Sequence, residues 1–155
     1  MMLNKGLPVL IEKPFTTNLA EAKDLTLLAK QKNTFVMVGH SEQFNPAYQE
    51  MCKMAVLPFR DLKAYRMINS PHRCRDISVV LDLMIQELGM LAQIAPRKKP
   101  KIRTRVMRRN HWQDEIFANL SFAVGCEADI VACRRAKKEK QVMILKDRKC
   151  DCPVK

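Results

Sequence analysis

The sequence predicts a parallel α/β unit followed by a mainly antiparallel α+β part, with a buried helix between them. Three observations support this fold class. The first forty or so residues have the pattern strand, helix, strand; residues 78–94 are apolar nearly all round; and from Lys101 onward apolar and polar residues alternate with a period of two. A chain of 155 residues can form one domain or two small lobes. We expect two parts here, residues 1–45 and 46–155.

The first strand is predicted over residues 7–11, a continuous apolar run that ends in the polar and rigid residues 12–14. Such a run is typical of a strand that is covered on both faces. Asn18, with an acidic residue three positions later, has the pattern of a helix N-cap, and helical spacing continues to about residue 32. A second apolar run, residues 35–38, completes a βαβ unit with parallel strands.

The carboxyl ends of these two strands carry the first candidate site. Glu12, Lys13 and Pro14 follow one strand, and Gly39 and His40 follow the other. Ligands of open α/β sheets bind at this edge. A lysine beside a rigid proline could offer a fixed ammonium group to a ligand oxygen, but it could also be an ordinary surface lysine, and the histidine could be purely structural.

The next segments alternate between helix and strand. Asn45 before Pro46 is the start signal of a helix that should end before Pro58. The remaining predictions are a strand over 62–68, a core helix over 78–94, strands over 102–106, 117–124, 128–133 and 141–145, and turns at Gly125 and over 137–140. The later strands should form a sheet with one buried and one solvated face.

The core helix has one polar or small stripe. Asp82, Gln86, Gly89 and Gln93 follow one another at spacings of four, three and four, so they share a face of the helix. A buried carboxylate is unfavourable unless it is paired or used in chemistry. Asp82 is therefore either a functional acid or a hydrogen-bonded structural one.

Composition excludes several classes of protein. The chain has only four glycines, and the closest two, Gly6 and Gly39, are 33 positions apart, so no G-x-G-x-x-G or Walker loop exists. A complete nucleotide-binding domain is thereby excluded. No apolar stretch is long enough for a membrane span or a signal peptide. We expect a cytoplasmic protein whose six cysteines are mostly free thiols.

The net charge of +12 is concentrated in residues 97–109, a stretch without an acidic residue that is followed by Trp112. It is either a loop with a solvated strand face or a surface for an anionic polymer, and without a recognised motif only non-specific, salt-dependent nucleic-acid binding is expected. His72-x-Cys74 and Cys150-x-Cys152 lack paired C-x-x-C spacing, so no metal site is expected.

Three segments together resemble a known family. IEKPFTTNLAEAKDLTLLAKQKNTFVMVGHSEQFNPAYQEM (11–51), DISVVLDLMIQELGMLAQI (76–94) and ANLSFAVGCEADIVACRRA (118–136) resemble the glucose-fructose oxidoreductase, inositol dehydrogenase and MocA family of NAD(P)-dependent oxidoreductases. The EKP tripeptide and the later GH-x-x-x-FNPA are its most specific parts. The resemblance implies the C-terminal part of a Rossmann-type parallel sheet, followed by part of the family's mainly antiparallel substrate-side sheet.

The resemblance also implies a reaction, the transfer of a hydride between a sugar, nucleotide sugar or cyclic polyol and the nicotinamide of NAD or NADP. On the cofactor side, Lys13 matches the family lysine near the nicotinamide and the reacting hydroxyl. Glu12 and Pro14 match its neighbours in the cofactor cleft, and His40 is a further cofactor-binding candidate. Both cofactors and all three substrate classes stay open.

Two catalytic candidates lie on the core helix. Asp82 matches the aspartate of the family's D-x-x-x-H motif, and Gln86 stands where that motif has histidine. An amide can form hydrogen bonds but cannot accept the proton as histidine does.

A second departure from the family is the absence of its first hundred or so residues, which carry the glycine-rich fingerprint. The family's sheet also continues beyond the position of Lys155, so the chain resembles a fragment opened at both ends. We therefore expect weak or no NAD(P) binding by the chain alone, and a homo-oligomer through the antiparallel sheet. The alternative is a degenerate, non-catalytic remnant that acts as a basic partner- or nucleic-acid-binding module.

Overall fold

The computed structural model describes residues 2–54, 59–70, 72, 74, 76–95, 97–109, 112–146 and 151–154. The chain divides into two compact units, Met1–Ser41 and Glu42–Lys155. The division lies four positions before the boundary expected at residue 45. The roles expected for the two parts, cofactor side and substrate side, stay a prediction.

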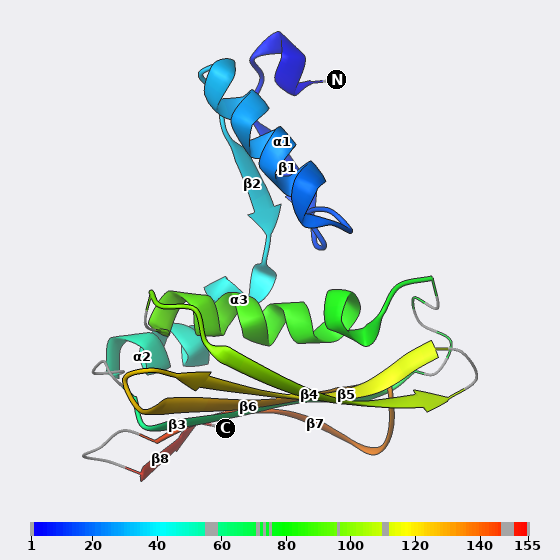
Figure 1. Ribbon diagram of the computed structural model, residues 1–155, viewed down its shortest axis with the longest axis vertical. Coiled ribbons are helices and arrows are strands. Elements are labelled where there is room, and N and C mark those ends of the chain that lie inside the picture. Colours follow the sequence, from blue (N-terminus) through cyan, green and yellow to red (C-terminus); the bar gives the residue numbers. More distant parts are fainter. Residues whose placement is uncertain are drawn as a thin grey trace. The chain divides into compact units, whose positions relative to one another are not determined.

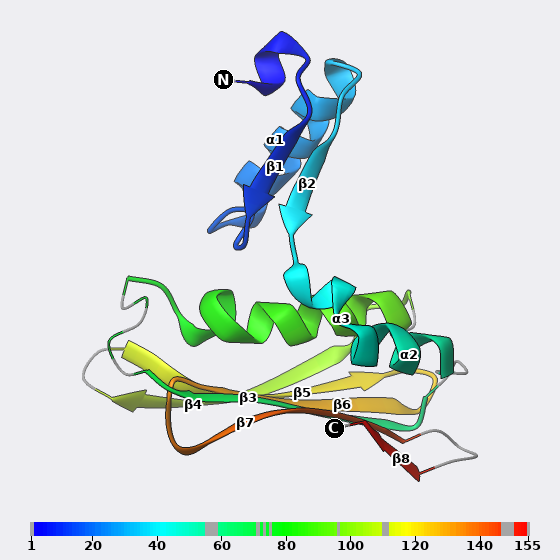
Figure 2. The same ribbon diagram turned by 180° about the vertical axis from the view of Figure 1, so that it is seen from behind.

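The first unit is the predicted βαβ arrangement. Strands β1 (Val9–Glu12) and β2 (Val36–Gly39) pair in parallel, and α1 (Leu19–Gln31) connects them and packs against one face of the pair (Figure 1). A short 3-10 turn, η1 (Leu3–Lys5), precedes β1. The Asn18 side chain caps α1 by accepting a hydrogen bond from the Glu21 backbone N–H at 2.9 Å, as its sequence pattern predicts. The uncovered face of the pair is seen in Figure 2.

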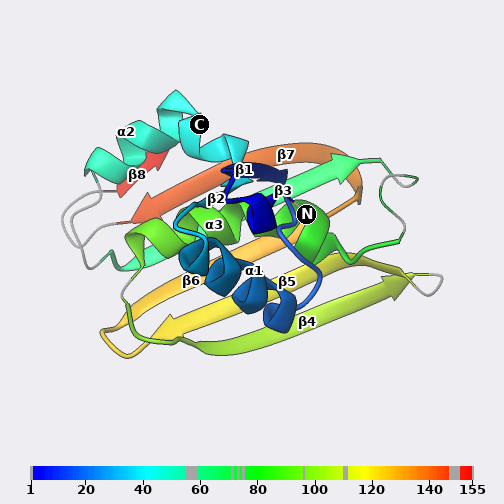
Figure 3. The same cartoon turned by 90° about the horizontal axis from the view of Figure 1, so that it is seen from above.

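The second unit is a six-stranded sheet with its described helices on one face (Figures 1 and 3). Its elements are η2 (Ser41–Phe44), α2 (Pro46–Met54), β3 (Asp61–Asn69), η3 (Val80–Met84), α3 (Ile85–Ile94), β4 (Lys101–Arg109), β5 (Trp112–Phe122), β6 (Cys126–Cys133), β7 (Arg135–Lys146) and β8 (Asp151–Val154). The strand order is β4-β5-β6-β3-β7-β8, and every pair is antiparallel except β3 with β6. The predicted mainly antiparallel sheet is confirmed.

Two local predictions differ from the structure. The predicted turn over 137–140 is wrong, because these residues lie inside β7. Their charged side chains are exposed. Among them Lys140 pairs with Met67 of β3, and the register then shifts to Asn69 opposite Arg135, so the pairing is irregular here although the residues stay extended. The predicted helix over 78–94 is present, but its first part, η3, is a π-helical turn.

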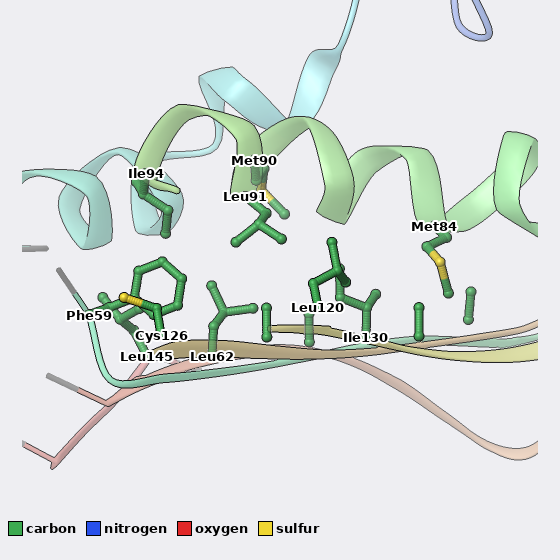
Figure 4. Packing of buried hydrophobic residues seen from close by; sticks show 14 of the residues in the cluster. Phe59, Leu62, Met84, Met90, Leu91, Ile94, Leu120, Cys126, Ile130 and Leu145 are labelled. Atoms are coloured by element: carbon green, nitrogen blue, oxygen red, sulfur yellow. The ribbon is translucent and has the colours of Figure 1, made fainter. Parts of the chain in front are cut away.

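The core of the second unit lies between α3 and the sheet (Figure 4). Met84, Leu91 and Ile94 point down from the helical segment onto Leu62 and Ile130 of the strands, and all five are at most 5 % exposed. On β6 the inward positions are Cys126, Ala128, Ile130 and Ala132, each 0 % exposed. These mostly small side chains let the helix approach the middle of the sheet closely. No described segment of this unit covers the opposite face of the sheet.

Candidate functional site

The cofactor-side candidates of the first unit lie at the ends of β1 and β2. Glu12 is the register partner of Gly39, so the two strand ends meet as the βαβ pattern predicts. A Cβ at position 39 would lie 3.2 Å from the Glu12 carboxyl group, so glycine leaves room for that side chain across the strand end. Lys13 and Pro14 follow Glu12 and are half-buried. The His40 Nδ1 atom is buried without a hydrogen-bond partner among the described residues.

Asp82, the first catalytic candidate of the second unit, is buried and paired. Its side chain is 1 % exposed, and its Oδ2 lies 3.8 Å from Nη2 of Arg134, which is fully buried. The same guanidinium donates hydrogen bonds to the backbone carbonyls of Cys74 (2.6 Å) and Ile77 (3.0 Å). Asp82 is therefore a paired carboxylate at the start of the helical segment, and its catalytic role stays a prediction.

Gln86 lies one helical turn after Asp82 and is only 8 % exposed. Its Oε1 atom is buried, and within the described part of the chain no donor reaches it. Farther along the predicted stripe Gly89 is half-buried and Gln93 is exposed. The stripe thus passes from the interior to the surface, and only its first half places polar groups inside the unit.

A second group of buried charges was missed by the sequence analysis. Arg66 of β3 forms ion pairs with Glu87 of α3 and with Glu42 of η2, the latter at 3.2 Å. Gln141 of β7 also donates to the Glu42 carboxylate, at 3.1 Å. A signal was present, because Leu62, Ala64 and Arg66 occupy alternate positions of one strand, and a charge on a buried face predicts a buried partner.

Glu87 is the most strongly buried acid of this group, with its side chain 3 % exposed. Burial raises the pKa of the Glu87 carboxyl above its ordinary value, and the neighbouring Arg66 guanidinium opposes this effect only in part. One of its oxygens, Oε1, accepts from Arg66. The other, Oε2, is buried and has no hydrogen-bond partner among the described residues.

A cavity of about 100 Å³ lies next to these charges, inside the second unit. Its wall combines polar side chains with apolar ones; they include Glu42, Arg66, Glu87, Gln141, Tyr48, Met51, Met90 and Met143. The Tyr48 hydroxyl donates to the Met90 carbonyl at 2.8 Å and so ties α2 to α3. Burial raises the pKa of this hydroxyl, which keeps it protonated as a donor. The cavity therefore offers hydrogen-bond acceptors, donors and an apolar wall within a small space.

The uncovered face of the sheet has a different character. Residue pairing aligns Phe117, Val131, Tyr65 and Val142 in one row across four strands. The Lys140 ammonium lies 3.7 Å from the Tyr65 ring centroid, and the basic β4 side chains Lys101, Arg103 and Arg105 are exposed beside the row. The side chains of Arg108, Arg109 and Trp112, which belong to the predicted basic surface, lie outside the described part.

Further sequence hypotheses concern metals and membranes. Among the described residues, no three His, Cys, Asp or Glu side chains lie close enough together to hold a metal ion. The side chains of Cys150 and Cys152 are outside the described part, and Cys52 and Cys74 are free thiols. None of the described helices has the length and apolarity needed to cross a membrane.

Comparison with known proteins supports the family resemblance that the sequence indicates. The profile of the family described as "Oxidoreductase family, NAD-binding Rossmann fold" (GFO_IDH_MocA) matches residues 1–40. The solved UDP-N-acetylglucosamine 3-dehydrogenase GnnA from Acidithiobacillus ferrooxidans is 27 % identical in sequence and has a TM-score of 0.84, over 92 % of this chain and 48 % of that one. Residues 1–40 thus match the profile of the glucose-fructose oxidoreductase, inositol dehydrogenase and MocA family, and most of the chain shares the fold of this solved dehydrogenase.

Other known proteins are similar to the chain in sequence or in fold. UDP-N-acetylglucosamine 3-dehydrogenase of Acidithiobacillus ferrooxidans is 34 % identical over 88 residues, which are 57 % of this chain and 28 % of that protein. Scyllo-inositol dehydrogenase from Lactobacillus casei shares the fold with a TM-score of 0.83 at 15 % identity, over 98 % of this chain and 50 % of that one. WlbA from Chromobacterium violaceum, solved with NADH and UDP-GlcNAcA, has a TM-score of 0.81 at 11 % identity, over 95 % of this chain and 48 % of that one. The chain spans about half the length of these solved relatives.

The pairing of Asp82 with Arg134 leads to a prediction about stability. Asp82→Asn removes a buried countercharge, and breaking a buried ion pair in this way should lower the free energy of unfolding by about 3–5 kcal/mol. The matched control is Asp61→Asn, since Asp61 pairs at 2.8 Å with Arg60 at an exposed position and should lose less than about 1 kcal/mol. Urea denaturation followed by circular dichroism measures both. Equal losses would show that the buried pair contributes no more than the exposed one.

The raised pKa of Glu87 leads to a prediction about pH. The folded chain holds the Glu87 proton more tightly than the unfolded chain, so its contribution to stability is full below the ordinary pKa of 4.5 and is lost as pH rises through the folded value. Glu87→Gln does not titrate and should lack this component. The free energy of unfolding, measured from about pH 4 to about pH 8, should therefore fall in the parent relative to the variant. If the free energy of unfolding of the parent instead rises relative to that of the variant as pH increases, the effect of Arg66 on the Glu87 pKa is larger than the effect of burial.

Proposed function

We propose that this chain, together with the parts of the family fold that it does not contain, forms a dehydrogenase that moves a hydride between a sugar, nucleotide sugar or cyclic polyol and NAD or NADP. The observation that carries the proposal is the pairing of Glu12 with Gly39 at one sheet edge, directly before Lys13 and His40, in a chain whose first forty residues match this family. The names of the relatives supply the substrate class. The cytoplasmic location expected from the sequence belongs to the same proposal.

The cofactor-side residues suit the nicotinamide half of the cofactor. The buried His40 Nδ1, which no described residue hydrogen-bonds, lies next to a strand end kept open by Gly39 and is suited to a bound polar group. We assign Glu12, Lys13, Pro14 and His40 to this role. No glycine-rich loop is present to hold the diphosphate, so the chain alone should bind NAD or NADP weakly or not at all.

The chemistry assigns different roles to the candidate side chains. Oxidation of a secondary alcohol breaks a C–H bond, whose hydride goes to the nicotinamide, and an O–H bond, whose proton must go to a base. We assign Lys13 to the developing alkoxide, which its ammonium group would stabilise. Asp82, already paired with Arg134, keeps the helical segment in position for Gln86.

Gln86 limits the rate in this proposal. Its amide can hydrogen-bond the substrate hydroxyl but cannot take the proton, so the proton must leave through water.

The alternative function, a non-catalytic basic module, is supported by the same residue, because a glutamine at this position cannot act as the base. The exposed Lys101, Arg103 and Arg105 would then provide non-specific binding to nucleic acid that weakens steeply with salt.

The test of catalysis uses the chain fused to the glycine-rich N-terminal half of a family member. Gln86→His should raise dehydrogenase turnover by about 10²- to 10⁴-fold, since it restores a general base, and should add an inflection near the histidine pKa to the pH profile. Lys13→Ala should lower turnover. NADH fluorescence titration establishes cofactor binding in each protein, and the unfused chain is the control that should not bind.

Two outcomes would contradict the proposal. If the fusion binds cofactor but Gln86→His changes neither the rate nor the pH profile, residue 86 is not at the reacting hydroxyl. The second outcome combines two results: the fusion neither binds cofactor nor turns over substrate, and the chain binds a DNA sequence even in the presence of competitor DNA. If that binding is lost when Arg103 and Arg105 are replaced, the binding-module function replaces the enzyme.

We also propose that the uncovered sheet face joins copies of the chain. The apolar row of Phe117, Val131, Tyr65 and Val142 has basic β4 side chains next to its β5 end and acidic side chains farther along β6, so two copies of the face have complementary charges. Phe117→Asp should raise the dimer dissociation constant about tenfold or more, as measured by analytical ultracentrifugation. Ile102→Asp, 62 % exposed on the opposite face of β4, is the control. An equal effect of both changes would exclude this face as the interface.

A further inference from the structure

Strand β4 forms one edge of the six-stranded sheet. It is the first strand in the order β4-β5-β6-β3-β7-β8, and no described segment pairs with its outer side (Figure 3). An edge strand directs a row of unpaired backbone N–H and C=O groups away from the sheet, and these groups can pair with a further strand. The outer side of β4 therefore offers the hydrogen-bonding groups that an extended segment needs.

The helix side of β4 is apolar and uncovered. Ile102 and Val106 continue the buried layer of the sheet, since they are the register partners of Leu120 and Ile116 on β5. However, Ile102 is 62 % exposed and Val106 is 39 % exposed, whereas both partners are buried. Removing these two apolar side chains from water is favourable, so an added strand would be stabilised by apolar side chains of its own on this side.

The other side of β4 is basic. Arg103 and Arg105 alternate with the apolar residues and are exposed on the face of the sheet that no described helix covers. Glu115 of β5 lies beside them, but among the described residues no acid forms an ion pair with either arginine. Two cations that are two residues apart on a strand attract carboxylates that have the same spacing on a neighbouring strand.

A groove next to β4 has the same combination of properties. It has a volume of about 350 Å³, and its wall includes Leu88 and Leu91 of α3 and Leu120 of β5. Lys98 and Lys99 also line the groove, and both are exposed. The groove thus joins an apolar wall to cations on the helix side of the sheet.

These features select among kinds of partner. A second copy of β4 would place basic side chains opposite basic ones, which is destabilising. A nucleic acid would supply negative charge but no apolar side chain at every second position, so Ile102 and Val106 would stay in water. An extended polypeptide in which acidic and apolar residues alternate satisfies the backbone edge and both sides of the strand together.

We propose that β4 binds an extended acidic segment of a partner protein, which joins the sheet as a further strand. The apolar side chains of the segment pack on Ile102 and Val106, and its carboxylates face Arg103 and Arg105. The groove beside α3 receives an apolar residue at one end of the same segment. The proposal is independent of hydride transfer and of the apolar row that joins copies of the chain.

The test uses the whole chain and short fluorescent peptides. In the probe peptide glutamate and valine alternate; one control peptide has the same residues with all valines grouped at one end, and another has lysine in place of glutamate. Fluorescence anisotropy should give a dissociation constant of about 100 µM or lower for the alternating peptide and values at least about tenfold higher for both controls. In hydrogen–deuterium exchange the bound peptide should protect amide hydrogens of β4 and leave those of β6, in the middle of the sheet, unchanged.

Variants at exposed positions assign the binding to the two sides of β4. Ile102→Ser removes an apolar contact without a change of charge and should weaken binding of the alternating peptide about fivefold. Arg103→Glu replaces attraction by repulsion and should weaken it at least about tenfold. The matched controls are Val124→Ser, in the turn between β5 and β6, and Lys138→Glu, an exposed cation of β7. Both controls should bind the peptide as the parent does.

Several results would overturn the proposal. Equal binding of the peptide with grouped valines would reduce the effect to attraction between charges, and protection confined to other strands would place the peptide elsewhere. If a single-stranded DNA binds more tightly than the alternating peptide and Ile102→Ser does not weaken it, β4 is a nucleic-acid surface. If no peptide binds, the basic side chains only keep the edge from pairing with other chains.

Discussion

Pairing of buried charge beneath the helical segment 80–94 is the constraint on which the second unit depends. Asp82 and Glu87 enter a mainly apolar interior, and an unpaired buried charge would be unfavourable by several kcal/mol. Arg134 and Arg66 supply the partners from two separate places in the sheet. An apolar helix can slide on an apolar sheet at little energetic cost, but a helix with two buried ion pairs has one favourable position. The charges thus set the register of α3 on the sheet.

Arg134 also contacts the chain on both sides of the point where the segment starts as a π-helical turn. Arg134 lies between β6 and β7 and donates to the carbonyls of Cys74 and Ile77, which precede the turn, as well as facing Asp82 within it. The chain is therefore anchored at both sides of a single guanidinium. π-Helical turns are often found at functional sites, where they redirect side chains. Here the turn precedes Gln86 by two residues, so it determines where the position-86 side chain lies.

Much of the fold follows from local sequence signals, and the part that does not depends on distant pairs. Asn18 and Asn45 cap the helices that their patterns predict, and the alternation in β5 and β6 matches their buried and exposed faces. The position of β3, parallel to β6 and antiparallel to β7, has no local signal because it is set by contacts across many residues. The charged run at 137–140 resembles a turn, but exposed strand positions accept the same residues.

The site was predictable to the extent that its chemistry is encoded in short motifs. The residues at 12–14 and 39–40 follow from strand ends, and Asp82 follows from one carboxylate in an apolar helix. Glu87 lies next to Gln86, but its importance depends on Arg66, 21 positions earlier, and on a cavity that no motif describes. An inward-facing arginine on a strand is the one local clue to such a group.

Net charge misleads about this chain because its two kinds of basic residue have opposite roles. Arg66 and Arg134 are neutralised by acids in the interior and contribute specificity of structure, whereas Lys101, Arg103 and Arg105 extend into water along an edge strand. The excess of +12 therefore describes the surface and says little about the cavity, where acids outnumber arginines. The position of α3 on the sheet is decided by which charges are paired inside this unit, and only the three-dimensional structure shows that pairing.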